Sequence, residues 1–440
     1  AIVIVLAVSK GGVQHGIVRF YNEYQDENQR QSQAFIASML FGGLAIAALV
    51  ASAWFFANAT FADVLIDNAF AVQLLLLSGV LVFLRAGESV LLAFFRAEQK
   101  TIRLNIYRVA SKYFVLGMIL ALLFLYSRSL TTFYSAQIFA MSATLCFLFG
   151  WRMRLSHPRI NTFSKEIFGP VLLYGLPLIG FELGSVLLNF VDRYLIQYYL
   201  GAEAVGYYSA AYNLTDYAKD LVVLPMATAV MPIYLQIWAS KGAYSTRSFL
   251  RKALKSYMLL AIPLVFGFMA IREDLISVVA SEKFIQGHVI IPYVIAGMMI
   301  NGALPILAAS VYIQKKTGIL VGLLALVIVI NVGMNIALIP ESGIQGAAVA
   351  KLVSFSVLAF CAARYTYKHL DFRFPWQAFL QYIFAGAVMY VVLGTVHISN
   401  HFISLITEIG VGGFIYFLLI FMFDNSVRKK VLEYLQRFRR

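Results

Sequence analysis

Residues 318–363 contain two apolar runs that decide the class of the fold: GILVGLLALVIVINVGMNIALI over 318–339 and GIQGAAVAKLVSFSVLAFCAA over 343–363. Each run has about the 20 residues that a helix needs to cross roughly 30 Å of hydrocarbon. Pro340 and Gly343 end the first run and turn the chain, and the small residues at 346–348 allow the second helix to pack closely against a neighbour. The stretch therefore predicts two membrane-spanning helices joined by a tight turn.

The same kind of apolar run recurs along the whole chain of 440 residues. Hydrophobic residues make up 61% of the chain and charged residues only 13%, whereas soluble domains carry about 25% charged residues. The composition thus predicts an all-α polytopic membrane protein. The runs predict about thirteen transmembrane helices, over residues 1–18, 34–57, 70–95, 104–126, 132–150, 168–191, 204–236, 257–271, 289–313, 318–339, 343–363, 377–396 and 401–423.

Lysine and arginine collect on one side of these helices, which is the pattern that a cytoplasmic face shows. If residues 19–33 are cytoplasmic, most basic loop residues and the carboxy terminus are cytoplasmic as well. The opposite side receives Arg128, Arg193, Arg272 and Lys283. The net charge of +14 is spread over many short loops, which favours contact with anionic membrane lipids and argues against nucleic acid as a partner.

The chain begins at Ala1 within an apolar run, and the first predicted helix runs from outside to inside. The segment Gly16–Tyr21 at its end can be aligned with Ala229–Tyr234 at the end of the seventh helix, because each has a small residue and a tyrosine in matching places. The helix at 168–191 would then have a counterpart before Ala1. We therefore expect a further segment of about 30–50 residues there, containing one more helix.

Two patches of the sequence carry sharper motifs. The first contains Tyr174-Gly175-Leu176-Pro177, Asn189, Asp192-Arg193-Tyr194, Leu200-Gly201, Val205-Gly206-Tyr207-Tyr208 and Ala211-Tyr212. The second contains Asn331, Asn335, Ile339-Pro340, Gly343 and Gly346-Ala347-Ala348. With these motifs, and with its helix spacing over nearly the whole length, the chain resembles the polysaccharide transporter (Wzx-type) branch of the multidrug/oligosaccharidyl-lipid/polysaccharide exporter (MOP) superfamily.

This resemblance implies fourteen helices in two lobes that rock about a central cavity. It also implies a flippase that moves an undecaprenyl-diphosphate-linked oligosaccharide from the cytoplasmic to the periplasmic leaflet of a bacterial inner membrane. Lipid II flippases and cation-coupled multidrug exporters share the fold, so both remain alternatives. The expected partners are the lipid-linked oligosaccharide diphosphate, membrane lipids, H⁺ or Na⁺, and a polysaccharide polymerase with its export machinery.

The domain organisation that follows has four parts. We expect an amino-terminal transmembrane lobe at 1–150, a cytoplasmic linker at 151–165 and a carboxy-terminal lobe at 166–363. Residues 364–440 should add two further transmembrane helices and a basic cytoplasmic tail.

Four basic residues lie inside predicted helices, where a charge costs several kcal/mol and points to function. They are Lys10, Arg85, Arg108 and Lys112. Three of them lie about 13–17 Å from the cytoplasmic ends of three different helices, and Arg108 stands one turn from Lys112, where like charges repel unless an anion or water accompanies them. We predict that the four bind the diphosphate. In the alternative, Glu88 pairs with Arg85 and the other cations reach toward the interface.

Three acidic residues, Asp216, Asp220 and Glu182, are the candidates for ion coupling. Asp216 and Asp220 share a helical face with Lys219, so two acids surround one base. Glu182 lies deeper in its predicted helix and has no obvious local partner in the sequence. We predict that these acids bind H⁺ or Na⁺, and a self-neutralised polar patch is the alternative for residues 216–220.

Enzymatic motifs are missing from the sequence. It has no Walker motif, Gly-rich dinucleotide loop, His-Glu-x-x-His motif or Gly-x-Ser-x-Gly elbow, and the predicted cytoplasmic loops are too short for a catalytic domain. Cys146 and Cys361 both lie in apolar runs, which speaks against a disulfide framework or a Cys-based metal site. We therefore predict a transporter without enzymatic activity, cofactor or metal, and keep a membrane-embedded sugar polymerase as a more distant alternative.

Cysteine accessibility tests the topology. Cysteine at Asp67 or Ser342 should react with an impermeant thiol reagent added to intact cells, whereas cysteine at Gln99 or Gly242 should be protected, because the basic loops mark the cytoplasmic side. Labelling at Gln99 from outside would overturn the helix count.

Overall fold

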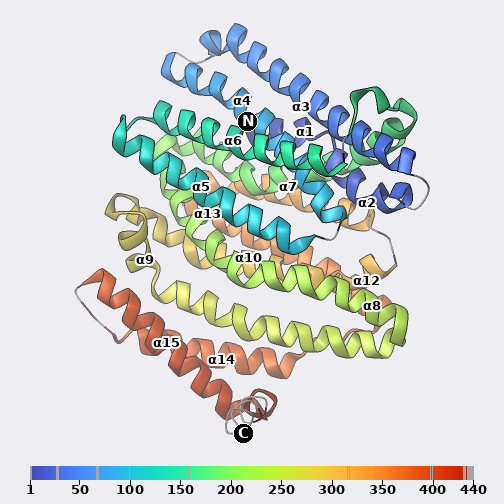
Figure 1. Ribbon diagram of the computed structural model, residues 1–440. Coiled ribbons are helices and arrows are strands. Elements are labelled where there is room, and N and C mark those ends of the chain that lie inside the picture. Colours follow the sequence, from blue (N-terminus) through green and yellow to red (C-terminus); the bar gives the residue numbers. More distant parts are fainter. Residues whose placement is uncertain are drawn as a thin grey trace. The chain divides into compact units, whose positions relative to one another are not determined.

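The computed structural model describes residues 2–25, 29–65, 69–98, 100–156, 158–314, 316, 318–396, 398, 400–429 and 433. Helices make up nearly all of this part of the chain, and it contains no strand (Figure 1).

The first α-helices are α1 (Ile2–Ser9), α2 (Val13–Gln25), α3 (Gln29–Leu65), α4 (Ala69–Ala97), α5 (Thr101–Leu125), α6 (Leu130–Ser156), α7 (Lys165–Leu200) and α8 (Ala202–Ala270). They are followed by α9 (Arg272–Val279), α10 (Ile291–Gly302), α11 (Leu304–Leu307), α12 (Ala309–Ile313), α13 (Gly318–Leu370), α14 (Trp376–Leu393) and α15 (His401–Phe423). The 3₁₀ helices are η1 (Ile160–Thr162) and η2 (Glu282–Ile290).

Among the described residues, 11 helical stretches are long and apolar enough to cross a membrane. One of them, Gly318–Leu370, holds both of the apolar runs at 318–339 and 343–363, and Gly343 divides it with a φ of 60°. α8 is divided in the same way at Gly242, where φ is 73°, and Figure 1 shows that α8 turns back on itself. Glycine adopts this left-handed conformation without a steric penalty. The predicted all-α membrane fold is thus confirmed.

Two predicted helices are interrupted in the structure. The helix predicted at 1–18 is α1 followed by α2, because Gly11 and Gly12 have φ values of 59° and 69° and cannot continue a right-handed helix. The helix predicted at 289–313 begins as part of η2 and then consists of α10, α11 and α12. Pro305 lies in the first turn of α11, where its missing N–H group is tolerated, and this explains the boundary after α10.

The structure also refines the choice of cysteine probes. Asp67 and Gln99 lie outside the described residues. At Gly242 a cysteine would be strained by the positive φ, so the exposed Ser240 of α8 is the better position on that side. Cys146 is exposed and should be replaced before labelling.

The chain forms two compact units, Ala1–Val186 and Leu187–Arg440, with the boundary inside α7. The core of the first unit contains buried side chains of α2, α3 and α4, among them Ile17, Met39 and Phe94. Val171 of α7 belongs to the same core, so the first half of α7 packs with the first unit. The lobe boundaries at 150 and 166 stay a prediction.

An ionic cluster lies at the end of α4 in the first unit. Glu98 pairs with Arg152 and accepts hydrogen bonds from Lys100 Nζ (2.6 Å) and the Tyr21 hydroxyl (3.0 Å). Burial opposes the ionised form of Glu98, but the hydrogen bond from Lys100 and the charge of Arg152 outweigh it and hold the pKa of Glu98 below its usual value. Arg152 is only 4% exposed and its guanidinium carbon lies 4.3 Å from the centre of the Phe94 ring. The cluster therefore supplies a counter-ion to a buried arginine.

A second ion pair is fully buried in the second unit. Lys351 Nζ of α13 lies 2.6 Å from Asp192 Oδ2 of α7, and both side chains are 0% exposed. Lys351 also donates to the Leu188 carbonyl (2.7 Å), and the Tyr208 hydroxyl of α8 donates to Asp192 (2.8 Å). Because every charged group of the pair has partners, the pair joins α7, α8 and α13 without leaving an uncompensated charge.

Removal of one partner tests this buried pair. Lys351→Met leaves the Asp192 carboxylate without its counter-ion, and we expect the free energy of unfolding to fall by about 3–5 kcal/mol. The combined variant Lys351→Met with Asp192→Leu removes both charges and should recover part of that loss. Thermal unfolding of the purified proteins in detergent measures the effect. A double variant whose loss equals the sum of the two single losses would show that the residues are not coupled.

Candidate functional site

A cavity of about 640 Å³ in the first unit is lined by side chains from α4, α5 and α6 and from the break between α1 and α2. Five basic residues line it: Lys10, Arg85, Arg96, Arg108 and Lys112. Glu88 is the acidic residue among the lining side chains. The structure therefore brings together all four residues that were predicted to bind the diphosphate, and it adds a fifth.

Helical periodicity explains why α4 and α5 present these side chains together. Arg85, Ser89, Leu92 and Arg96 recur at steps of three or four residues and so share one face of α4. Arg108, Ser111, Lys112 and Val115, at positions i, i+3, i+4 and i+7, likewise share one face of α5. The cavity is thus formed where these two faces and the α1–α2 break border the same space.

Lys10 lies at the break itself, directly before Gly11 and Gly12. A Cβ atom on Gly12 would come within 2.2 Å of the Gly175 carbonyl oxygen, so only glycine permits this approach of the chain to α7. Gly175 belongs to the Tyr174-Gly175-Leu176-Pro177 motif, and the Tyr174 ring packs edge-on against Phe20 of α2. The motif therefore has a local structural role: it holds the break, and with it Lys10, against α7.

Glu182 of α7 pairs with Lys10. Its second oxygen accepts a hydrogen bond from Gln14 Nε2 (3.1 Å), and His15 Nε2 lies 3.8 Å from that oxygen. The sequence offered no local partner for Glu182, because the residues that contact it are more than 160 positions away in the chain. A predicted ion-coupling residue thus lies next to a predicted anion-binding residue.

Within the described part of the chain, the remaining four cations have no such partner. Between described residues, no ion pair within 4.0 Å involves Arg85, Arg96, Arg108 or Lys112. Glu88 instead accepts a hydrogen bond from the Tyr107 hydroxyl (3.0 Å). The cavity therefore holds an excess of positive charge that its own acidic residue does not neutralise.

Arg96 was missed as a site residue because the helix was expected to end at residue 95, which placed Arg96 among the cytoplasmic loop residues. α4 continues to Ala97, and Arg96 lies on the face of Arg85, eleven residues and about three turns further on. That spacing was visible in the sequence and could have identified it.

The other candidates for ion coupling lie on α8, in the second unit. Lys219 Nζ lies 2.7 Å from Asp216 Oδ1, with exposed side-chain fractions of 25% and 42%. The side chain of Asp220 lies outside the described part of the structure. Between residues that are described, no group of three or more His, Cys, Asp or Glu side chains is placed to hold a metal ion.

Comparisons with known proteins agree on the family. A model of the polysaccharide biosynthesis protein family matches residues 1–289. The chain is 24% identical over 245 residues to the probable low-salt glycan biosynthesis flippase Agl15 of Haloferax volcanii. The aligned region makes up 55% of this chain and 51% of the relative. The chain thus spans about half the length of this curated relative.

Solved structures show the same fold. The chain superposes on the lipid II flippase MurJ in an inward closed conformation with a TM-score of 0.73 and 17% identity, covering 96% of this chain and 90% of that one. An inward-facing multidrug resistance MATE family transporter of the MOP superfamily gives a TM-score of 0.65 and 18% identity, covering 84% and 88%. Since the family model alone matches more than half of its length, the chain belongs to the polysaccharide biosynthesis protein family.

Proposed function

We propose that the protein flips an undecaprenyl-diphosphate-linked oligosaccharide from the cytoplasmic to the periplasmic leaflet of a bacterial inner membrane by alternating access. The observation that carries this proposal is the cavity lined by Lys10, Arg85, Arg96, Arg108 and Lys112 within apolar helices. Cations in such surroundings are costly unless they meet an anion or water, and their number exceeds that of the acids beside them.

A diphosphate fits this set of side chains chemically. Arginine binds phosphate oxygens through two parallel hydrogen bonds, and lysine provides a compact charge with three donors. Each hydrogen bond to a charged group contributes about 1.5–3 kcal/mol. Arginine and lysine together can therefore hold the diphosphate while it leaves the aqueous phase, whichever sugar is attached to it.

Membership of a polysaccharide biosynthesis family and the likeness to a glycan biosynthesis flippase support a lipid-linked glycan as the cargo. Lipid II, whose flippase shares the fold, also carries a diphosphate and remains an alternative for the same cavity. An exporter of organic cations is disfavoured, since a cationic cavity repels such drugs. A membrane-embedded sugar polymerase would lengthen the glycan instead of moving it.

Ion coupling is part of this proposal. Asp216, Asp220 and Glu182 would bind H⁺ or Na⁺, and a polysaccharide polymerase and its export machinery would receive the flipped glycan. For Glu182, the contact with Lys10 suggests how coupling would reach the anion site, since an anion on Lys10 would compete with the carboxylate.

Neutralising the cavity should impair flipping. We expect Arg108→Gln and Lys112→Gln each to reduce flipping of a lipid-linked oligosaccharide about tenfold or more, because one charge-assisted bond is lost. Lys10→Gln and Arg85→Gln should reduce it as well. Transfer of a labelled lipid-linked glycan in proteoliposomes of matched protein content provides the measurement.

Arg103→Gln is the matched control, because Arg103 is an exposed arginine of the same helix α5 that does not line the cavity. Full activity in all four cavity variants would remove the cations from the mechanism. Transport of an organic cation by the wild type in the same vesicles would favour the drug exporter instead.

Asp220→Asn tests the coupling residues. It should abolish the stimulation of flipping by an imposed ion gradient and leave binding of the lipid-linked diphosphate unchanged, because a carboxylate that binds the ion is lost. Glu203→Gln, at the exposed start of α8, is the control. If Asp220→Asn still shows full gradient-driven flipping, residues 216–220 form a self-neutralised polar patch and take no part in ion coupling.

A further inference from the structure

Glu408 is an acidic residue within the apolar helix α15, and it faces protein instead of lipid. The buried residues of α15 are Ser404, Leu405, Glu408, Gly412, Tyr416 and Ile420, which repeat about every four positions and form one face. Glu408 is only 8% exposed and lies seven residues after His401, roughly 10 Å along the helix from its start. A buried carboxyl at this depth points to function.

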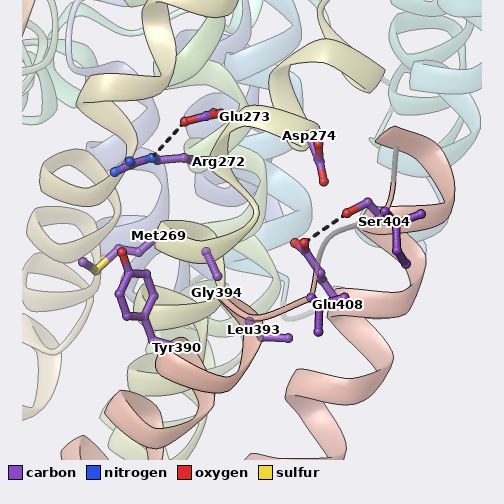
Figure 2. A pocket seen from close by; sticks show the side chains of 12 residues that line it. Met269, Arg272, Glu273, Asp274, Tyr390, Leu393, Gly394, Ser404 and Glu408 are labelled. Carbon is purple, nitrogen blue, oxygen red and sulfur yellow. Dashed lines mark hydrogen bonds and ion pairs between the residues drawn. The ribbon is translucent and has the colours of Figure 1, made fainter. Parts of the chain in front are cut away.

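A cavity of about 490 Å³ in the second unit reaches Glu408 (Figure 2). It lies between the end of α8, the start of α9, the end of α14 and the first turns of α15. Oε1 of Glu408 accepts a hydrogen bond from the Ser404 hydroxyl (3.0 Å). Oε2 is buried and has no hydrogen-bond partner among the described residues. One oxygen of the carboxyl is thus left for a ligand.

The other charged groups around the cavity already have opposite charges beside them. Glu273 lies 3.9 Å from Arg272 Nε and 3.6 Å from His288 Nε2, and Asp274 accepts from His401 Nδ1 at 2.6 Å. Figure 2 shows Asp274 pointing toward the Ser404–Glu408 pair, while Arg272 pairs with Glu273 away from it. Tyr390 of α14 is the titratable group contributed by that helix. Among the described residues, Glu408 is therefore the acid of this cavity that has no base beside it.

We propose that Glu408 is a proton-binding site that exchanges with solvent through this cavity. A proton neutralises the carboxyl without requiring further ligands, whereas the described residues offer no cluster of three or more side chains for a metal ion. The cavity is polar and large enough for water, which would accept a hydrogen bond from protonated Oε2 and carry the proton. Asp216 differs from Glu408, since it is 42% exposed and paired with Lys219.

Infrared difference spectroscopy tests the binding itself and does not depend on the proposed function. For the full-length chain in liposomes, spectra taken at about pH 8 and about pH 5 should contain a carboxyl C=O band that Glu408→Gln lacks. Glu23→Gln, which removes an exposed carboxylate, should retain the band. Identical spectra for the wild type and Glu408→Gln would overturn the proposal.

Ser404→Ala provides a second variant that keeps the carboxyl. The Ser404 hydroxyl donates to Glu408 and favours its ionised form, so the midpoint of the band should rise by about 0.5 pH unit or more without it. An unchanged midpoint would mean that the band does not belong to Glu408.

A role in transport rests on the proposed function and needs its own assay. In proteoliposomes, Glu408→Gln should flip the lipid-linked glycan but lose the dependence of the flipping rate on an imposed pH gradient. If the wild type flips no glycan, the proposed function fails while the infrared result still decides the proton site. If the variant keeps the full gradient response, Glu408 has no part in coupling.

Discussion

Placing a charge in hydrocarbon costs several kcal/mol, and this cost governs how the ionic residues of the protein are arranged. Water is absent from the bilayer core, so a charged side chain there needs a counter-ion, a set of hydrogen bonds or a wet cavity. Lys351 and Asp192 meet this requirement by pairing with each other, at 2.6 Å and with no exposed surface. Arg152 meets it through Glu98 at the end of α4. These two pairs account for ions that serve the fold.

Arg85, Arg96, Arg108 and Lys112 of the first unit and Glu408 of the second have no such counter-ion among the described residues, and we assign all of them to function. In the first unit, basic side chains of α4 and α5 line a cavity beside one acid that is hydrogen-bonded to Tyr107. In the second unit, Glu408 lines a cavity whose other acids already have bases, and one of its oxygens has no hydrogen-bond partner among the described residues. The first arrangement fits an anion and the second fits a proton. An anion site and a proton site built from different residues can be altered separately, which lets mutation separate cargo binding from coupling.

Glycine controls where the first of these sites lies. Gly11 and Gly12 interrupt the helix that would otherwise carry Lys10 along a regular face, and Gly12 contacts the backbone of Gly175 so closely that no side chain fits between them. The break brings Lys10 to the cavity and next to Glu182. Because α7 also contributes to the core of the first unit through Val171, the contact at Gly175 is supported by packing along the same helix. The position of Lys10 thus depends both on the backbone break at Gly11 and Gly12 and on its ion pair with Glu182.

The sequence alone predicts the all-α membrane class, the apolar segments and the basic residues that lie within them, because hydropathy and charge are local properties of the chain. It also predicts that Lys10, Arg85 and Lys112 lie at a similar depth, since residues can be counted along a helix, whereas the packing of α4, α5 and the α1–α2 break brings their side chains to one cavity. The pairing of Glu182 with Lys10 and of Asp192 with Lys351 depends on how the helices pack, because these partners lie far apart in the chain. Glu408 escaped the sequence analysis for the same reason: one acid near a helix start looks like an interfacial residue until its neighbours show that it is buried.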